Sequence, residues 1–396
     1  MASDYKYQDD EKTLYTDDGV SIPWFTSDTD AYLNKTTLIF GGSGSGKTTI
    51  IEEILVHLQK ACPNFLVIAP KTSRKAYSKK FPKRCIKEDL TKQKIEAIWQ
   101  RQYYVTQMYN IANDMTVMES IFEKKPDRET KLLIAAIKKR TETFIDGVRR
   151  SSENWATKKG QITRIEELQE KRIRALYKKY IIKNQESLKR ITLNKKQMVA
   201  VEYVDFNPNF TLVIDDSSEK ISKWLKYWKK GNEESPIEKI FFKGRWQNIT
   251  LVLGAHDDKF VPPELRKNGR NTIFCERSAL IAGLNKQSSG YTKDQKKTAE
   301  KMALSIFDDE SSKFRTHKKF VYVREDAKPF KYFIANLYPE IKMGCDALYD
   351  LAKSMPKQED DFDSNPFLQQ YISPGNSAKK KKKAKYKPSR GRHKYV

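Results

Sequence analysis

The sequence predicts an α/β fold, in which a mostly parallel sheet is flanked by helices and built around a phosphate-binding loop. Residues 36–40 form a short apolar run that is followed by a glycine-rich loop and by apolar residues at helical spacing over 50–58. A later apolar run ends in two adjacent acids, Asp215 and Asp216. Short apolar runs also alternate with helical patterns along much of the chain, which is typical of parallel strands joined by covering helices.

The composition fits a folded protein of ordinary core content. The chain has 396 residues, enough for two domains or for one large domain with insertions. Apolar residues make up 38% of it and charged residues 32%. Because no apolar run reaches about 18 residues and the N-terminus has no apolar segment, we expect neither a membrane span nor a signal peptide. The four cysteines are scattered, which argues against disulfides and a zinc site and suits a reducing compartment.

Two segments supply nearly all of the net charge of +25. Residues 379–396 contain ten Lys or Arg and no acid, and residues 131–200 contain nineteen Lys or Arg against seven Asp or Glu. The rest of the chain carries an excess of only three positive charges. Concentrated positive charge of this kind most often meets a polyanion such as nucleic acid.

The N-terminal half divides into a lead-in, the first part of the core and a helical insertion. Residues 1–34 are polar and are expected to run over the surface. Residues 35–87 open the core, and residues 88–200 read as a basic insertion of several helices, because glycine is scarce there and apolar residues recur at helical spacing. Residues 163–166 match a capping box, which predicts a helix start. The basic helix faces suit solvent and nucleic acid equally well.

The α/β pattern resumes over residues 201–284 and gives way to a basic tail. Residues 285–355 are expected to form the last core strands or a small α/β domain. Residues 356–378 read as a linker, and residues 379–396 as a disordered basic tail. Beyond the first strand, the strands are expected at residues 64–70, 210–216, 249–254, 271–275, 319–323 and 330–334, the last two as a hairpin.

The glycine-rich loop matches the phosphate-loop pattern G-x-x-x-x-G-K-[ST] at every fixed position. Its glycines would let backbone N–H groups close around phosphates, and the following helix N-terminus favours negative charge. Lys47 would reach the β- and γ-phosphates of ATP, and Thr48 would hold Mg²⁺. The residues expected to bind the nucleotide are Gly41, Gly42, Ser43, Gly44, Ser45, Gly46, Lys47, Thr48 and Thr49.

The apolar run that ends in two acids has the Walker B form. Such a strand buries its apolar residues and delivers both carboxylates beside the phosphates. We expect Asp215 to hold the Mg²⁺ shell, directly or through water. We expect Asp216 to orient or deprotonate the attacking water, so ATP and Mg²⁺ are the predicted cofactors.

Two further residue types are candidates for catalysis. Arg245 precedes the strand that follows the two acids, and it could stabilise transition-state charge in a neighbouring subunit. A surface role or an internal salt bridge is an equal alternative, and Arg266 and Arg270 are rival candidates. His256 follows the same strand, where it could sense the γ-phosphate through a hydrogen bond or simply cap a turn.

Taken together, these segments resemble the FtsK–HerA superfamily of RecA-like P-loop ATPases, and within it the DNA-packaging ATPases of large DNA viruses and of small short-tailed phages. The superfamily usually has glutamine where His256 stands, and the helical stretch before the two acids is longer than expected. The resemblance covers about residues 35–85 and 208–280. It is carried by residues 41–48, 66–70, 215–216, 241–245, 249–258 and 262–268.

The resemblance implies an ATPase that translocates double-stranded DNA as a homo-oligomeric ring of five or six subunits. It further implies a portal at the vertex of a viral procapsid as partner, and the cytoplasm or nucleus of an infected host cell as location. It assigns Lys47 to phosphate, Asp216 to the attacking water and Arg245 to a neighbouring site. A HerA-like helicase or pump, a nucleotide kinase and a nucleic-acid-binding scaffold without turnover remain alternatives.

Overall fold

The structure is a computed structural model, and its described residues fall into two compact units. The first unit contains the described residues up to 102 and from 209 onward, and the second contains residues 103–208. The predicted linker and basic tail lie outside the described residues. The structure describes residues 14–89, 91–217, 220–223, 225, 234–257, 259, 261–286, 291–308, 317–338, 342–344 and 346–354.

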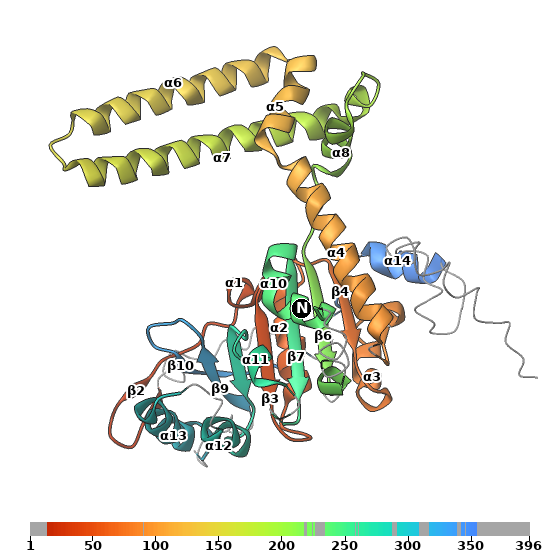
Figure 1. The fold of residues 1–396 in the computed structure, drawn as a ribbon, viewed down its shortest axis with the longest axis vertical. Helices are drawn as coiled ribbons and strands as arrows, with labels where there is room; N and C mark the ends of the chain where they lie inside the picture. Colours follow the sequence, from red (N-terminus) through yellow and green to blue (C-terminus); the bar gives the residue numbers. More distant parts are fainter. Residues whose placement is uncertain are drawn as a thin grey trace, which may run out of the picture. The chain divides into compact units, whose positions relative to one another are not determined.

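The first unit is built on an eight-stranded sheet (Figure 1). The strands from β8 to β5 are all parallel to their neighbours, as the sequence predicts, and β9 and β10 continue the sheet antiparallel to β8. The region around residues 318–334 therefore supplies the last strands of this sheet. Across the sheet the strands are β10 (Phe330–Ile334), β9 (Lys318–Val323), β8 (Asn271–Phe274), β3 (Thr36–Phe40), β7 (Ile249–Ala255), β6 (Phe210–Asp215), β4 (Asn64–Ile68) and β5 (Ile86–Lys87).

Both faces of this sheet are buried. In β6, Leu212 and Ile214 belong to one apolar cluster and Val213 to another, so successive side chains enter cores on opposite faces. A strand buried on both faces reads as an unbroken apolar run, which is why these strands stand out in the sequence. The remaining elements of this unit are β1 (Leu14–Tyr15), β2 (Ser21–Ile22), α1 (Thr29–Tyr32), α2 (Lys47–Leu58), α3 (Lys71–Ser78), α10 (Pro236–Lys243), α11 (Pro263–Arg266), α12 (Arg277–Asn285), α13 (Lys293–Phe307) and α14 (Asp346–Ser354).

The helix after the phosphate loop begins earlier than its apolar pattern suggests. α2 starts at Lys47, whereas apolar residues at helical spacing start only at Ile50. The first three helical residues are polar, so periodicity carries no signal for them. The helix N-terminus therefore lies directly at the end of the glycine-rich loop.

The second unit is helical. Its core is a cluster that includes Met118 of α5, Tyr177 of α7 and Val201 of α8. Every helix in the described part of the chain is too short or too polar to cross a lipid bilayer. The helices of this unit are the end of α4 (Lys92–Ala112), α5 (Met115–Lys124), α6 (Arg128–Arg150), α7 (Trp155–Leu188) and α8 (Lys195–Tyr203).

The predicted helix start at residues 163–166 is wrong. α7 begins at Trp155, where the side chain of Asn154 accepts a hydrogen bond from the Thr157 N–H. Thr163 lies well inside the helix. Once a helix has passed its costly nucleus, each further residue adds one backbone hydrogen bond, so a Thr-x-x-Glu pattern on an exposed face does not interrupt it.

Candidate nucleotide site

The phosphate loop joins the end of β3 to the start of α2, and its glycines are needed for shape and for space. Gly44 and Gly46 have φ values of +77° and +93°, a region in which side chains are strained. At Gly41, a Cβ would lie 2.4 Å from Ser45 Oγ and 2.8 Å from Cys275 Cβ. Gly46 is the N-cap of α2 and offers no side chain to its first N–H groups, which suits an anion at this end of the helix.

Lys47 connects three parallel strands at this edge of the sheet. Its side chain is buried, and its Nζ donates to the carbonyl oxygens of Gly41 and Gly42 at 3.0 and 2.9 Å. The same Nζ lies 3.7 Å from Asp216 Oδ1, after β6, and 3.3 Å from His256 Nδ1, after β7. The structure thus brings three of the four predicted catalytic residues into contact.

The two ring nitrogens of His256 face Lys47 and Asp216. Nδ1 faces the Lys47 ammonium, which can only donate, so Nδ1 accepts. Nε2 lies 3.3 Å from Asp216 Oδ1, a buried oxygen that has no hydrogen-bond partner among the described residues. Asp216 itself has φ +48°, a left-handed backbone that Asp tolerates better than most residues. This backbone turn lets the strand end deliver its second acid next to Lys47.

Asp215 lies behind this group and is fully buried. Burial and the charge of Asp216 raise the pKa of Asp215 to about 6. Its Oδ2 accepts a 2.9 Å hydrogen bond from the hydroxyl of Tyr77, on α3. Burial and the nearby Asp215 raise the pKa of Tyr77 well above its ordinary value, and the Thr48 hydroxyl opposes this shift. Tyr77 therefore holds Asp215, one of the two residues that are expected to bind Mg²⁺.

The surroundings of Asp215 and Thr48 fit Mg²⁺. Oδ1 of Asp215 is buried and has no hydrogen-bond partner among the described residues. The absence of a side chain at Gly254, in β7, makes room for this oxygen, because a Cβ at that position would lie 2.7 Å from Oδ1. Mg²⁺ usually takes one or two protein oxygens and fills its remaining positions with water and phosphate oxygens. An unpartnered, buried carboxylate oxygen at the end of β6 and a threonine hydroxyl at the start of α2 match that requirement.

Two charged residues behind the loop were missed by the sequence reasoning. Glu276, the N-cap residue of α12 after β8, accepts a 2.8 Å hydrogen bond from the Gly42 N–H. Lys319, in β9, is buried and donates to the Ser45 carbonyl at 2.9 Å, and burial lowers its pKa. Lysine within an apolar strand was the available signal for the second of these. Both residues hold the loop backbone, Glu276 at its start and Lys319 near its end.

The candidate arginines lie apart from this group. Arg245 is exposed in the 3-10 turn Gly244–Gln247, at the start of β7, and its guanidinium carbon lies 4.5 Å from the ring centre of Trp246. β7 has seven residues and spans about 20 Å, so Arg245 lies at the opposite edge of the sheet from the phosphate loop of its own chain. Arg270 precedes β8 at that same edge and pairs with Glu325 at 2.7 Å. Arg266 is half-buried in α11.

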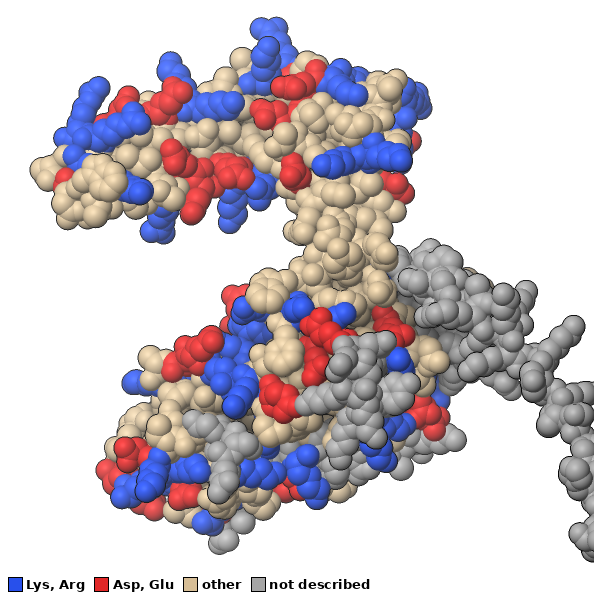
Figure 2. All heavy atoms as spheres, viewed as in Figure 1, with Lys and Arg blue, Asp and Glu red and all other residues tan. Residues whose placement is uncertain are grey.

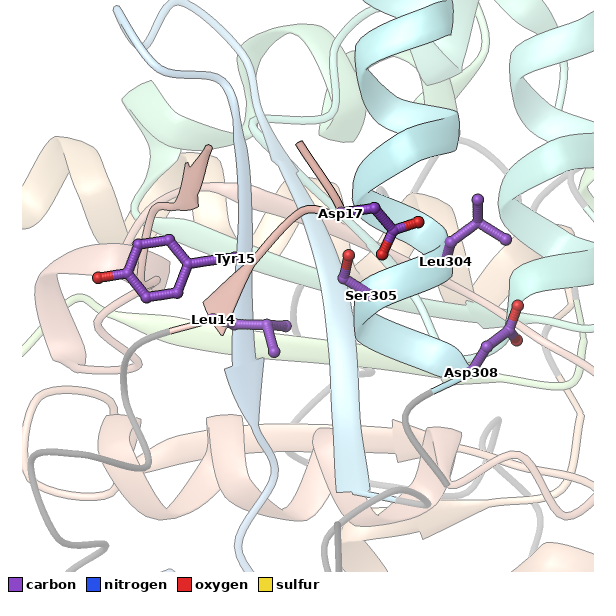
Figure 3. Close-up of a pocket in the computed structure, with 6 residues that line it drawn as sticks. All are labelled: Leu14, Tyr15, Asp17, Leu304, Ser305 and Asp308. Carbon is purple, nitrogen blue, oxygen red and sulfur yellow. The ribbon is translucent and has the colours of Figure 1, made fainter. Parts of the chain in front are cut away.

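A separate hollow lies on the surface between β1 and α13 (Figure 3). It is open, has a volume of about 410 Å³, and contains none of the predicted site residues. We assign no chemistry to it. Its lining residues are Leu14, Tyr15, Asp17, Leu304, Ser305 and Asp308.

Comparison with known sequences identifies viral relatives. No protein-family model matches the chain. The chain is similar to the uncharacterized protein B354L of African swine fever virus, for example in isolates Pig/Kenya/KEN-50/1950 and Warthog/Namibia/Wart80/1980. The two sequences are 26% identical over 380 residues, which covers 90% of this chain and 98% of the viral protein.

Comparison with solved structures returns several partial matches at low sequence identity. One is the genome packaging NTPase B204 of Sulfolobus turreted icosahedral virus 2 in complex with ATP-gammaS, at 10% identity, 77% of this chain, 98% of that chain and a TM-score of 0.33. Another is the plasmid coupling protein TrwB in complex with ADP and Mg²⁺. It is 11% identical to this chain, the match covers 80% of this chain and 90% of that chain, and the TM-score is 0.30.

A third is the cytoplasmic domain of the type VII secretion ATPase EccC of Thermomonospora curvata, at 12% identity, 88% of this chain and a TM-score of 0.31. This chain spans 31% of that EccC structure. TM-scores of this size describe a partial overlap of folds.

Proposed function

We propose that this chain is an ATP hydrolase that drives double-stranded DNA into a viral procapsid as part of a homo-oligomeric ring. The observation that carries the hydrolase is the contact of Lys47, Asp216 and His256 at the end of three parallel strands. Ligands of open α/β sheets bind at this edge, and a glycine-rich loop followed by a helix N-terminus is an anion site.

In this proposal each residue acts on the triphosphate in a defined way. The loop N–H groups and the Lys47 ammonium bind the β- and γ-phosphates. Asp216 accepts a proton from the attacking water, whose oxygen bonds to the γ-phosphorus as the bond to the β–γ bridging oxygen breaks. His256 Nε2 lies 3.3 Å from Asp216 Oδ1, so a protonated imidazole there would favour the ionised carboxylate beside Lys47.

Mg²⁺ would be held by the hydroxyl of Thr48 and by Asp215, and when bound it neutralises charge that develops on the phosphate oxygens. The Tyr77 hydroxyl positions Asp215 through its hydrogen bond to Oδ2. Asp215 is buried and its Oδ1 has no hydrogen-bond partner among the described residues, so this oxygen is available to the ion. Glu276 and Lys319 keep the loop backbone in place during the reaction.

The DNA-handling part of the proposal is supported by charge. The excess of positive charge lies in residues 131–200 and 379–396 rather than around the nucleotide site. A motor must ignore sequence, and positive side chains that contact phosphates meet this need. The viral relative that matches over nearly its full length is consistent with a role in a virus. A nucleotide kinase would have no use for either basic segment.

ATP turnover by the purified chain, with and without duplex DNA, tests this function. We expect Lys47→Ala to abolish turnover, while Lys60→Ala, which changes an exposed lysine just after α2, keeps it. Stimulation by duplex DNA supports a DNA motor. A phosphate-transfer product in place of free phosphate would indicate a kinase, and strand separation without procapsid association would indicate a HerA-like helicase or pump.

A further inference from the structure

The outer half of the α6–α7 pair is an antiparallel two-helix hairpin with almost no core of its own (Figure 1). In α6, only Ile134 and Thr141 are buried. In α7, the buried residues all lie from Ile173 onward, where α5 and α8 pack. Two helices joined by so narrow a seam gain little from packing, so this extension costs stability. We therefore looked for a binding role in the side chains exposed at the far end of the hairpin.

We define the hairpin tip as residues 138–159, the end of α6, the connecting turn and the start of α7. Its turn is well ordered by local hydrogen bonds. Lys158 Nζ donates to the Arg149 carbonyl at 2.9 Å, Ser151 N–H donates to the Val148 carbonyl at 3.2 Å, and Asn154 caps α7. The backbone of the tip is therefore held in place by these local hydrogen bonds.

The tip presents exposed aromatic rings, each with a cation beside it. Trp155 is 73% exposed, and Lys159 Nζ lies 5.2 Å from its ring centre. Phe144 is 52% exposed, and the guanidinium carbon of Arg140 lies 5.4 Å from its ring centre. Large apolar rings are costly to leave in water, and pairing each with a cation favours an anionic, partly apolar partner.

The tip is also rich in positive charge. It contains seven Lys or Arg against three acidic residues. One of these acids, Asp146, is paired with Arg149 at 3.3 Å. Blue side chains are seen around this end of the helical unit in Figure 2, with red ones between them. A solvated helix face has basic residues without exposed aromatic rings beside them, so the combination of the two distinguishes this end.

We propose that the hairpin tip binds the sugar–phosphate backbone of duplex DNA. Lys and Arg contact phosphate oxygens, the Trp155 indole N–H can donate to a phosphate oxygen, and the ring bodies lie against the sugars. The contact is independent of sequence. This inference rests on the proposed function, because a motor that moves duplex DNA needs phosphate contacts beyond its nucleotide site.

A matched pair of charge variants tests the hairpin tip. The tip variant replaces Arg140, Arg149, Arg150 and Lys159 by Gln. The control variant replaces Lys189, Arg190, Lys195 and Lys196 by Gln, near the other end of α7 and about 50 Å away along that 34-residue helix. Both remove four exposed positive charges, and both break one surface ion pair, Arg149–Asp146 or Lys189–Glu186. Thermal melts followed by circular dichroism verify that each variant folds.

Binding of a labelled 40-base-pair duplex is measured by fluorescence anisotropy over a range of NaCl concentrations. We expect the log–log slope of affinity against salt to fall by about 0.9 for each phosphate that the tip variant no longer neutralises, and to stay unchanged in the control. Equal changes of slope in both variants, or none in either, would overturn the proposal. A Trp155→Ala variant that loses single-stranded but not duplex binding would also overturn it, in favour of base stacking.

The same proteins separate this inference from the proposed function. ATP turnover without DNA is expected to be equal in wild type and tip variant, while stimulation by duplex DNA falls only in the tip variant. If the tip variant remains fully stimulated, the hairpin tip does not bind the DNA and the ATP-driven function stands. If wild type binds duplex through the tip but turns over no ATP, the hydrolase fails and the tip assignment stands.

Discussion

The Tyr77 hydroxyl donates a 2.9 Å hydrogen bond to Oδ2 of Asp215 in the closed interior of the nucleotide site. A side chain from α3 thereby holds the carboxylate at the end of β6. Because Tyr77 is fully buried, its hydroxyl has no water to replace this partner.

Replacing Tyr77 by Phe should weaken the nucleotide site without breaking the core. The ring stays, but Asp215 loses a hydrogen bond that lowers its pKa, so its carboxylate becomes harder to ionise. We expect a loss of about 1–3 kcal/mol in the free energy of unfolding. Affinity for a fluorescent ATP analogue should fall in Mg²⁺ and much less in EDTA. Tyr104→Phe, at an exposed tyrosine, is the control; equal effects of both variants would contradict the role.

The pKa of Asp215 leads to a pH-dependent prediction. In the folded chain it is raised from 3.8 to about 6 by burial and by Asp216. Between these values the folded state binds more protons than the unfolded state, so stability falls as pH rises from 3.8 to 6. Above pH 6, ionisation of this buried carboxyl lowers the free energy of unfolding by an amount on the order of 3 kcal/mol.

Asp215→Asn should therefore raise stability at pH 7 while abolishing Mg²⁺-dependent nucleotide binding. Asn can still accept from Tyr77, and it removes the buried charge. The difference between variant and wild-type unfolding free energies, measured by urea denaturation without Mg²⁺, should grow from about pH 4 to about pH 6 and then level off. A difference that is constant over this range would show that Asp215 is not the group that titrates.

Asp216→Asn tests the group that handles the attacking water. Asn accepts the left-handed backbone at φ +48° as readily as Asp, so the fold should be kept. Its amide cannot take a proton, and we expect ATP turnover to fall by about 10²–10⁴-fold with nucleotide affinity nearly unchanged. Asp205→Asn, at an exposed acid of the helical unit, should have no effect. Full turnover in Asp216→Asn would exclude this residue as the base.

How far the sequence predicts this molecule depends on the kind of signal that each feature leaves. The buried strands and the phosphate loop are local patterns, and the structure confirms the strand at residues 36–40 and the parallel sheet around it. The contact of Lys47 with His256 follows from parallel strands that end at the same edge of the sheet, so it could be predicted from the sequence. Tyr77 is different, because only tertiary packing brings α3 beneath β6.

The same distinction explains the other misses. Glu276 follows a strand whose neighbour in the sheet is β3, yet nothing in its local sequence shows that its carboxylate turns to the Gly42 N–H. The helix start was predicted wrongly at residues 163–166 because a short polar pattern is compatible with both a helix end and a helix interior. Sequence periodicity predicts which face of a helix or strand is buried. Which other elements pack against that face depends on the whole fold.

Arg245 provides the last prediction, which concerns a neighbouring subunit. Since it lies at the opposite edge of the sheet from its own phosphate loop, about 20 Å away along β7, it cannot reach the phosphates bound by its own chain. Its exposed guanidinium beside Trp246 remains open to another chain. We expect Arg245→Ala to lower turnover by about 10³-fold or more, with the monomer fold unchanged.

Mixing this variant with Asp216→Asn tests action between subunits. In a random ring, a subunit with intact Asp216 can receive Arg245 from an Asp216→Asn neighbour, so roughly a quarter of the sites should regain activity. Steady-state turnover of the mixture, compared with each variant alone, measures this recovery. Arg266→Ala and Arg270→Ala, mixed in the same way, are the controls. Recovery with one of these and none with Arg245→Ala would move the role to that arginine, and the pairing of Arg270 with Glu325 makes it the weaker rival.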